Sequence, residues 1–308
     1  MAKKILITGV NGFLGKALWE YIKAKQFSFE VFGVDHAKLL SSRRLFLCDV
    51  SDKKDVLKII YYIRPDYIFH LSGGRMNAEK ELLRNNILAT RVLLEVVNSV
   101  SNYCPRIIIP GSAAEYGRTV SPVRETALTR PVSFYGLAKN TQTNLGLMYA
   151  RTGLDVVVGR IFNVCGYGTP PTLSLGHFSR EIALIEKSKK RLVIQTRNLR
   201  MKRDFLDIKD VCSALLKVAQ GGKSGEIYNI CSGNSFLMRD LLNELIGYSQ
   251  VDNIAIKEDN ESVQEVDISV GSNTKIKKVT GWKPKVTISQ SLKSTLRFYR
   301  DFLSKGQI

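Results

Sequence analysis

The first half of the chain alternates short, almost wholly apolar runs with longer segments in which apolar residues recur every three or four positions. The apolar runs occupy residues 3–9, 29–35, 43–49, 66–72, 106–112 and 154–164. The helical segments occupy residues 16–24, 52–63, 79–100 and 134–151. Strands that are apolar throughout and separated by helices are typical of a parallel sheet with helices on both faces. The pattern therefore predicts an α/β fold, a doubly wound parallel sheet of the Rossmann type.

The regular alternation ends near Cys165. Beyond it, the pattern predicts a loop, a helix, a strand and a closing helix at residues 166–172, 176–190, 191–196 and 291–303. We therefore predict a dinucleotide-binding domain over residues 1–164, to which residues 205–230 return. A smaller, interleaved substrate-binding lobe would take most of residues 165–308, and the cleft between the two would hold the substrate.

The stretch "ITGVNGFLG" places three glycines between the first strand and the first helix. Glycine lets the backbone turn tightly and approach a pyrophosphate, while the helix N-terminus offers backbone amides and the positive end of its dipole. The spacing G-x-x-G-x-x-G predicts a dinucleotide-binding loop, with a plain tight turn as the alternative. The residues of this loop that we assign to the cofactor are Gly9, Asn11, Gly12, Phe13, Leu14 and Gly15.

Asp35 ends the second strand, twenty positions after Gly15. A carboxylate at this point can accept both ribose hydroxyls of NAD, and it would repel the 2′-phosphate of NADP. Lys38, Arg43 and Arg44 follow closely in the sequence and could offset this repulsion. We therefore predict NAD as the cofactor and leave NADP open.

The ends of the other strands supply further candidates for cofactor binding. Asp49 follows the third strand, where it could reach the adenine or, equally, cap the next helix. The other residues that we assign to the cofactor are His36, Val50, Leu71, Ser72, Gly73, Asn86 and Ile161.

Candidate chemistry lies at Tyr135 and Lys139, which are four positions apart and so share one face of a helix. An ammonium group beside a phenol favours the phenolate and makes the tyrosine a better proton-transfer group. Ser112, at the end of an upstream strand, adds a hydroxyl that could hydrogen-bond a carbonyl oxygen. A chance surface pair would explain Tyr135 and Lys139 alone, but the combination with Ser112 and the glycines is far more specific.

On these motifs the chain resembles the extended short-chain dehydrogenase/reductase family, in its sugar-nucleotide branch. T-G-x-x-G-x-x-G matches Thr8 to Gly15, and Y-x-x-x-K matches Tyr135 to Lys139. "RIFN" at 160–163 and "KRDFLDIKDV" at 202–211 match further family segments. "NLRMKRDFLDIKDV", "GEIYNICSG" and "VGSNTKIKKVTGWKP" resemble GDP-mannose 4,6-dehydratases and, more strongly, GDP-4-keto-6-deoxymannose reductases.

The resemblance implies a role for each matched residue. Tyr135 would exchange a proton with the sugar oxygen while a hydride passes between the sugar carbon and the nicotinamide. Lys139 would hold the nicotinamide ribose and tune Tyr135, and Ser112 would orient the sugar oxygen. Asn163 and Arg203 would grip the diphosphate of the substrate, Arg203 through charge-assisted bonds. Outside these motifs, Arg180 and Arg239 are candidates for substrate contact, although solvated arginines are the commoner case.

Ala113 and Ala114 follow Ser112 at positions where dehydratases of this family carry an acidic or polar residue and then a glutamate. Alanine can neither donate nor accept a proton. Glu115 comes one position later, and in an extended segment it would point to the opposite side. The two alanines would line the substrate site, and dehydration is not expected.

The sequence therefore favours an NAD(P)H-dependent reductase of a nucleotide-linked 4-keto-6-deoxyhexose. The alternatives are an NAD-dependent nucleotide-sugar 4-epimerase and a non-catalytic NAD-binding sensor. GDP is the favoured nucleotide, and dTDP, UDP and CDP stay open. The family implies a homodimer formed through the helices at 79–100 and 134–151.

The net charge of +18 is the one unusual feature of the composition. We predict no nucleic-acid partner, because no nucleic-acid motif accompanies the basic runs; a phosphate-bearing substrate would use the same field. The five cysteines form no C-x-x-C pair, so neither a metal site nor a disulfide framework is predicted. No apolar run is long enough to cross a bilayer, and the N-terminal run reads as a strand, so we predict a cytoplasmic protein with no membrane partner.

Overall fold

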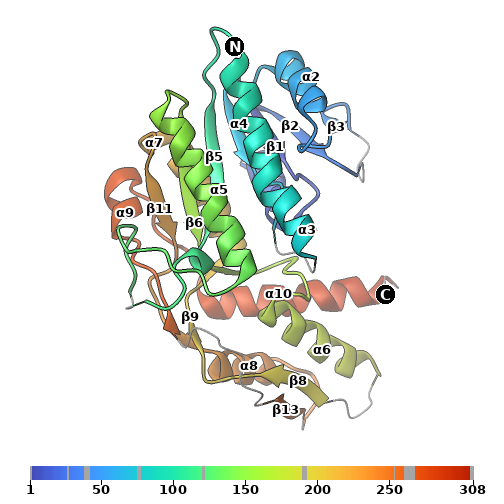
Figure 1. The fold of residues 1–308 in the computed structure, drawn as a ribbon. Helices are drawn as coiled ribbons and strands as arrows, with labels where there is room; N and C mark the ends of the chain where they lie inside the picture. Colours follow the sequence, from blue (N-terminus) through green and yellow to red (C-terminus); the bar gives the residue numbers. More distant parts are fainter. Residues whose placement is uncertain are drawn as a thin grey trace.

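The computed structural model describes residues 2–25, 28–37, 42–74, 78–119, 122–188, 193–252, 254–259 and 268–305. Its main feature is a seven-stranded sheet in which all neighbouring strands are parallel (Figure 1). In spatial order the strands are β11 (Ile227–Ile230), β6 (Val156–Ile161), β5 (Arg106–Ser112), β4 (Tyr67–His70), β1 (Lys3–Thr8), β2 (Phe29–Asp35) and β3 (Leu45–Leu47). The predicted fold class is confirmed.

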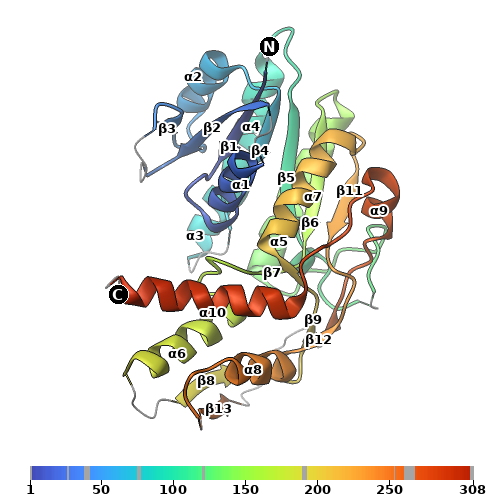
Figure 2. The ribbon, with the colours of Figure 1, turned by 180° about the vertical axis from the view of Figure 1, so that it is seen from behind.

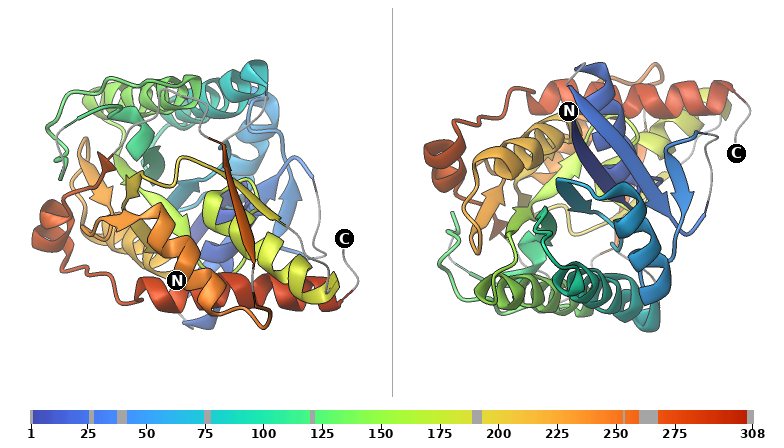
Figure 3. Two further views of the ribbon diagram at one scale, coloured as in Figure 1. Left: turned by 90° about the horizontal axis from the view of Figure 1, so that it is seen from below. Right: turned by 90° about the horizontal axis from the view of Figure 1, so that it is seen from above.

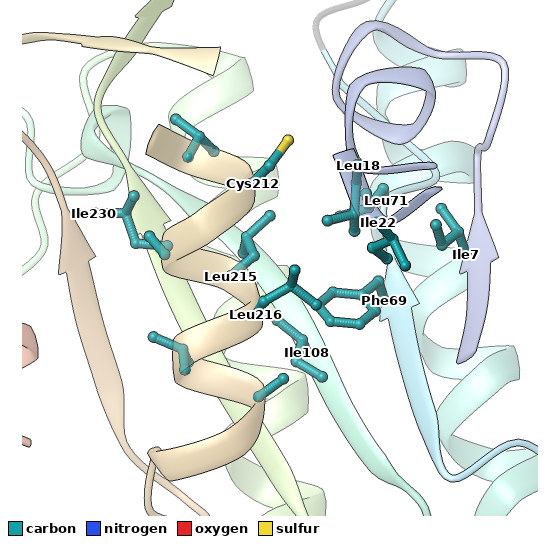
Figure 4. Packing of buried hydrophobic residues seen from close by; sticks show 14 of the residues in the cluster. Ile7, Leu18, Ile22, Phe69, Leu71, Ile108, Cys212, Leu215, Leu216 and Ile230 are labelled. Atoms are coloured by element: carbon teal, nitrogen blue, oxygen red, sulfur yellow. The ribbon is translucent and has the colours of Figure 1, made fainter. Parts of the chain in front are cut away.

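Helices cover both faces of this sheet. On one face lie α2 (Lys53–Ile63), α4 (Ala89–Ser99) and α5 (Phe134–Arg151), and on the other lie α1 (Phe13–Ala24) and α7 (Ile208–Gly221) (Figures 1 and 2). Apolar side chains from the strands fill both interfaces. On the α1/α7 side, Leu215 and Leu216 of α7 point towards the side of the sheet that carries Ile108 and Phe69 (Figure 4).

The helix predicted over residues 79–100 is divided into three parts. The parts are α3 (Glu79–Leu82), a π-helical segment η1 (Leu83–Leu88) and α4. A π-helical turn is rare and often lies at a functional site. Here it carries Asn86, which is fully buried.

The second lobe lies at the end of the sheet where the strands finish. Its core joins α6 (Ser174–Ser188), α8 (Met238–Gly247) and α10 (Ile288–Ser304). Helix α10 crosses between the sheet and the rest of this lobe, on the same side of the molecule as α1 and α7 (Figures 2 and 3). The lobe also contains a pair of parallel strands, β8 (Val193–Arg197) and β13 (Ala255–Asp259).

Short strand pairs connect the lobe to the main sheet. Strand β7 (Asn163–Cys165) pairs with β10 (Phe205–Asp207), and β9 (Lys202–Arg203) lies between β12 (Phe236–Leu237) and β14 (Ile268–Ser269). The chain then returns through α7 to β11, which pairs with β6, before it builds α8 and β13. The helix α9 (Thr274–Thr280) packs near β11. The domain limits at 164 and 165 stay a prediction.

None of the helices in the described ranges combines the length and the apolar character needed to span a bilayer.

Candidate active site

The strands of the main sheet end together at the edge that faces the second lobe. Because the strands are parallel and in register, Thr8 at the end of β1 lies beside His70 of β4, and Ser112 of β5 lies beside Ile161 of β6. Ligands of doubly wound sheets bind at this edge, near the point where the strand order reverses. The sequence order places that reversal between β1 and β4.

The glycine loop after β1 has the shape that a pyrophosphate site requires. Gly9 has a φ of +66°, and a Cβ added there would lie 2.8 Å from the carbonyl oxygen of Leu71. A Cβ at Gly15 would lie 2.1 Å from the carbonyl oxygen of Gly9. Gly12 is the N-cap of the twelve-residue helix α1 and gives it no side-chain cap, so the amides of the first turn can receive an anion. The loop fits the predicted dinucleotide.

Asp35 ends β2 beside this loop and is almost fully buried. Its carboxylate accepts a hydrogen bond from the Asn11 backbone N–H at 3.1 Å and lies 3.0 Å from Nδ1 of His36. The Asn11 side chain also donates to the Ala37 carbonyl. Asn11 thus fixes the Asp35 turn to the glycine loop, and both lie where the ribose of a dinucleotide is expected.

Of the basic residues near Asp35, Arg44 has its partners elsewhere. Arg44 pairs with Glu30 at 3.2 Å, and its guanidinium lies over the ring of Phe32. Lys38 lies outside the described residues. Arg44 is therefore not available to offset the repulsion between Asp35 and the 2′-phosphate of NADP, which supports the preference for NAD.

Asp49 does not cap helix α2. The N-cap is Asp52, whose carboxylate accepts from the amides of Lys54 and Asp55 at 2.8 and 3.1 Å. Asp49 instead accepts from the amide and hydroxyl of Ser51 and pairs with Arg84 of η1. The capping alternative was wrong, because the polar turn "DVSD" offers two aspartates and the chain uses the second one.

Ser112 and Tyr135 lie on two elements that touch. Ser112 ends β5 and caps the short 3₁₀ helix η2 (Ala113–Glu115), its hydroxyl accepting from the Ala114 amide at 3.2 Å. Tyr135 lies in the first turn of α5, next to Gly136, and a Cβ at Gly136 would lie 2.5 Å from the Ala114 carbonyl oxygen. Glycine at this position lets α5 pack closely against η2, and both Ser112 and Tyr135 stay partly exposed.

Lys139 lies one turn deeper in α5 and is almost fully buried. Its amine donates to the side-chain oxygen of Gln142, three positions further along the helix. Burial lowers the pKa of Lys139 to about 8, and the negative charge of Glu115 opposes that fall. A lysine with such a pKa can change its charge near neutral pH, which suits a group that supports proton transfer.

A chain of buried hydrogen bonds continues from Gln142 through Thr90 and His70 to Thr8 at the end of β1. Gln142 donates to the Thr90 hydroxyl at 2.7 Å, and that hydroxyl donates to the Asn86 carbonyl at 2.6 Å. The Thr90 proton is thereby used, so His70, whose Nε2 is 2.9 Å from the Thr90 oxygen, must be the donor there. The opposite ring nitrogen, Nδ1, then accepts from Thr8 at 3.0 Å.

Burial lowers the pKa of His70 to about 3, so the ring is neutral and carries its proton on Nε2. The amide of Ser72 donates to the Thr8 hydroxyl at 3.1 Å, which ends the chain at the loop after β4. Reasoning from the sequence missed these residues. The one available signal was the helical spacing of Gln142 from Lys139; Thr90 and His70 stand inside apolar runs that the pattern assigns to the core.

Asn86, predicted to contact the cofactor, lies behind the loop that follows β4. Its side-chain oxygen accepts from the Gly74 amide, and its side-chain nitrogen donates to the Gly74 and Leu82 carbonyls, each at 3.1 Å. Gly73, with a φ of +104°, leaves no room for a Cβ, which would lie 2.6 Å from the Asn86 oxygen. In this structure Asn86 holds the loop in place, and a direct contact with the cofactor stays a prediction.

On the substrate side, two of the predicted residues lie together. The side-chain amide of Asn163 donates to the carbonyl of Asp204 at 3.0 Å, directly after Arg203. The guanidinium of Arg203 bonds to the Lys202 carbonyl and to the sulfur of Met201. The β7–β10 and β9 strands thus bring Asn163 and Arg203 to one region, although they are forty positions apart.

The other two arginines lie on helices of the second lobe and are paired with acids. Arg180 of α6 lies 3.0 Å from Glu181, and Arg239 of α8 pairs with Glu258 of β13. Both arginines are exposed over two fifths of the side chain. Their contact with substrate stays a prediction.

Glu115 lies in a 3₁₀ turn and not in the extended segment that the sequence predicted. Residues 113–115 form a 3₁₀ turn, since Ser112 and Glu115 cap each other's ends. The Glu115 carboxylate is fully buried and pairs with Nε of Arg160 at 2.7 Å. The prediction of an extended segment was wrong because a capping box, S-x-x-E, closes the turn.

Within the described ranges, no group of three or more His, Cys, Asp or Glu side chains could hold a metal ion.

The site defines a class of protein: a Rossmann-type sheet with a glycine loop after the first strand, a carboxylate at the end of the second strand, and Ser112, Tyr135 and Lys139 on β5 and α5. The model of the NAD dependent epimerase/dehydratase family matches residues 5–231, and the chain belongs to this family. The family name confirms the predicted cofactor class, and the predicted resemblance to extended short-chain dehydrogenases/reductases is confirmed. Among the relatives of this chain are enzymes named for their action on nucleotide-linked sugars.

One curated sequence and two solved structures show how widely this similarity extends. The GDP-6-deoxy-D-mannose reductase of Pseudomonas aeruginosa is 28% identical over 307 residues, covering 96% of this chain and 97% of the relative. The structure of RMD from Pseudomonas aeruginosa complexed with NADPH has a TM-score of 0.87 at 26% identity and covers 97% of this chain and 99% of that one. The UDP-glucose 4-epimerase of Thermotoga maritima, solved with UDP-glucose, has a TM-score of 0.83 at 26% identity and the same coverage.

Proposed function

We propose that this chain reduces a nucleotide-linked 4-keto-6-deoxyhexose, with GDP as the favoured nucleotide. The observation that carries the proposal is the η2 turn: it follows Ser112, it packs against the helix α5 that carries Tyr135 and Lys139, and its first two residues are alanines. Similarity over nearly the whole chain to a relative named as a GDP-6-deoxy-D-mannose reductase supports the same reaction.

In this proposal the residues of the chain bind, orient and protonate. The glycine loop and the N-terminus of α1 hold the pyrophosphate of the cofactor, and Asp35 holds its ribose. The bound nicotinamide supplies the hydride for the sugar carbonyl carbon. Ser112 donates a hydrogen bond to the carbonyl oxygen, and Tyr135 gives that oxygen its proton, which completes the alcohol. Lys139 offsets the charge that is left on the Tyr135 oxygen.

The same turn argues against a dehydratase. Elimination of water needs an acid and a base beside the substrate, and Ala113 and Ala114 supply neither. Glu115 is fully buried and bound to Arg160, so its carboxylate has no path to a sugar.

The second candidate is an NAD-dependent 4-epimerase. Asp35 favours NAD, the cofactor that an epimerase keeps bound through its cycle, and the structural likeness to an epimerase crystallised with UDP-glucose supports this alternative. A Ser–Tyr–Lys set serves both reactions, which differ in the fate of the cofactor. A reductase consumes one reduced nicotinamide for each product and releases the oxidised form.

The test supplies 4-keto-6-deoxy sugars linked to GDP, dTDP, UDP or CDP together with NADH or NADPH, and follows the absorbance of the reduced nicotinamide. We expect stoichiometric consumption with the GDP sugar. The epimerase would be established by three results together: reduced nicotinamide is not consumed with any of the four nucleotide-linked sugars, NAD copurifies with the protein, and UDP-glucose is converted to UDP-galactose. If the protein binds the cofactor but turns over no sugar nucleotide, the non-catalytic NAD-binding sensor is the remaining function.

We also propose a homodimer that buries the outer faces of η1, α4 and α5. Large apolar side chains are exposed on two of these helices, Leu83 and Leu88 on η1 and Leu137 and Met148 on α5. Light scattering of the parent protein should give twice the mass of one chain, and light scattering of Leu137→Glu should give the mass of a single chain. A monomeric parent protein would contradict the dimer.

A further inference from the structure

Glu115 joins the three elements that carry the predicted chemistry. One carboxylate oxygen accepts from the Ser112 amide at 2.7 Å and from the Thr143 hydroxyl at 3.0 Å. The other accepts from Nε of Arg160 at 2.7 Å. Ser112 belongs to the end of β5, Thr143 to helix α5, and Arg160 to β6. A single buried side chain therefore connects the turn that holds Ser112 to the helix that holds Tyr135 and to the strand that leads to Asn163.

All three donors point at one acceptor. A protonated carboxyl group would have to donate one bond, whereas the Glu115 oxygens only accept, so the arrangement suits the ionised form. Burial raises the pKa of Glu115, and the positive charge of Arg160 opposes the rise. Arg160 is itself held by Tyr116, whose ring lies 4.6 Å from its guanidinium carbon and whose hydroxyl donates to Asn229 at 2.7 Å.

A buried ion pair is a poor device for stability alone. The desolvation of two charges cancels much of their attraction, and well-packed apolar residues often stabilise a fold as well or better. What the carboxylate adds is direction, because three hydrogen bonds fix the relative position of three backbone segments. Gly136 against Ala114 shows how closely two of these segments meet, since a single Cβ at Gly136 would lie 2.5 Å from the Ala114 oxygen.

We propose that Glu115 is a positioning residue: its carboxylate sets the place of the Ser112 turn against helix α5, and thereby the approach of the Ser112 and Tyr135 hydroxyls to one sugar oxygen. Glu115 touches neither sugar nor cofactor. Its effect on turnover presumes the reductase proposed above, whereas its effect on Lys139 can be measured without any substrate.

The effect on Lys139 follows from the charges around its amine. From η2, the Glu115 carboxylate raises the pKa of Lys139 against the larger lowering by burial. From β4, the neutral His70 ring contributes no charge, and from α5 itself Gln142 is a neutral acceptor. Arg160 of β6 partly cancels Glu115 through their ion pair. Loss of the Glu115 charge should therefore lower the pKa of Lys139.

The experiment compares Glu115→Gln with substitutions on helix α5. Thr143→Val removes the hydroxyl that ties α5 to Glu115, and Thr143→Ser restores it. Thr141→Val is the matched control, because the Thr141 hydroxyl is exposed and bonds only to the Leu137 carbonyl of its own helix among the described contacts. A misplacement of about 1 Å can cost about 10²-fold in rate, and we expect a kcat loss of about that size in Glu115→Gln with little change in KM.

Thr143→Val should lose kcat more mildly, while Thr143→Ser and Thr141→Val keep the parent value. Full kcat in Glu115→Gln, or equal kcat in Thr143→Val and Thr141→Val, would overturn the proposal. If Glu115→Gln does not fold, the kcat values of Thr143→Val, Thr143→Ser and Thr141→Val test the proposal.

The second measurement is the titration of Lys139 by ¹³C NMR of labelled lysine side chains, with the signal assigned through Lys139→Met. We expect a lower midpoint in Glu115→Gln than in the parent and an unchanged midpoint in Thr141→Val. If the parent turns over no keto sugar, the proposed function fails, and this titration still tests Glu115. Equal midpoints in the parent and Glu115→Gln would then overturn the proposal.

Discussion

The edge of the main sheet and the outer part of the second lobe hold their polar residues in opposite ways. At the sheet edge, Lys139, His70 and Glu115 are buried; His70 and Glu115 are bound by neighbours from other elements, and Lys139 is bound by Gln142 of its own helix. In the lobe, Arg180 and Arg239 are exposed and paired with one nearby acid each. A buried network fixes positions to fractions of an ångström, whereas exposed pairs contribute little and rearrange easily. From this comparison we propose that the reaction takes place at the sheet edge and that the lobe selects the substrate.

The largest effect expected from this comparison is at Tyr135. Tyr135→Phe keeps the ring and deletes the hydroxyl that we propose protonates the sugar oxygen. General acid catalysis contributes about 10²–10⁴-fold, so kcat should fall by at least that factor while the unfolding midpoint stays the same. An active Tyr135→Phe enzyme would remove the proposed mechanism.

The next effect concerns the pH dependence of stability. The pKa of Lys139 falls from 10.5 in a free side chain to about 8 in the fold. Between these values the unfolded chain holds one more proton than the native one, so stability rises with pH across that window, by about 3 kcal/mol in total. Below about pH 8 both states are protonated, and the cost of the buried charge is constant.

Lys139→Met should flatten this rise. Urea unfolding at pH 7.5, 8.5 and 9.5 measures it, with the exposed Lys16 replaced by Met as the control. A slope for Lys139→Met equal to that of Lys16→Met would show that the burial of Lys139 does not govern this part of the pH dependence.

Asp35 is expected to give a smaller effect, in cofactor binding. Hydrogen bonds to a charged group are worth about 1.5–3 kcal/mol, so Asp35→Ala should weaken NADH binding by roughly ten- to hundredfold and narrow any preference over NADPH. Fluorescence titration with both cofactors measures this. Equal affinities in the parent protein would show that the Asp35 carboxylate does not select the cofactor.

The sequence pattern predicted strands β1 to β6 of the main sheet and most of the helices on it within a few residues, and in the second lobe it predicted α6, β8 and α10 but not the short elements between them. Strand β5 and helix α5 have the predicted limits, because each is long and has one clear period. Strands β9, β12 and β14 have two residues each and pair with segments far away in sequence, so no local pattern marks them. Within the site, Tyr135, Lys139 and Ser112 carry motifs, whereas Thr90, His70 and Gln142 act through tertiary contacts that a sequence does not display.

The smallest effect should come from Arg239, and it tests the outer half of the comparison. Arg239 pairs with Glu258, whose carboxylate also accepts from the Leu199 amide at 2.8 Å. This bond to Leu199 and the charge of Arg239 together lower the pKa of Glu258, so the acid stays ionised without the arginine. Exposed pairs contribute about 0–1 kcal/mol, and Arg239→Ala should change the free energy of unfolding by no more than that.

The matched variant is Arg203→Ala, because Arg203 lies next to Asn163 at the predicted diphosphate site. Loss of a charge-assisted bond worth about 1.5–3 kcal/mol should raise KM for the sugar nucleotide by at least about tenfold in Arg203→Ala, against a small rise in Arg239→Ala. Initial rates over a range of sugar-nucleotide concentrations at saturating cofactor give both values. A rise in Arg239→Ala as large as that in Arg203→Ala would place the Arg239 guanidinium on the substrate, and its pairing with Glu258 would then be the arrangement that substrate replaces.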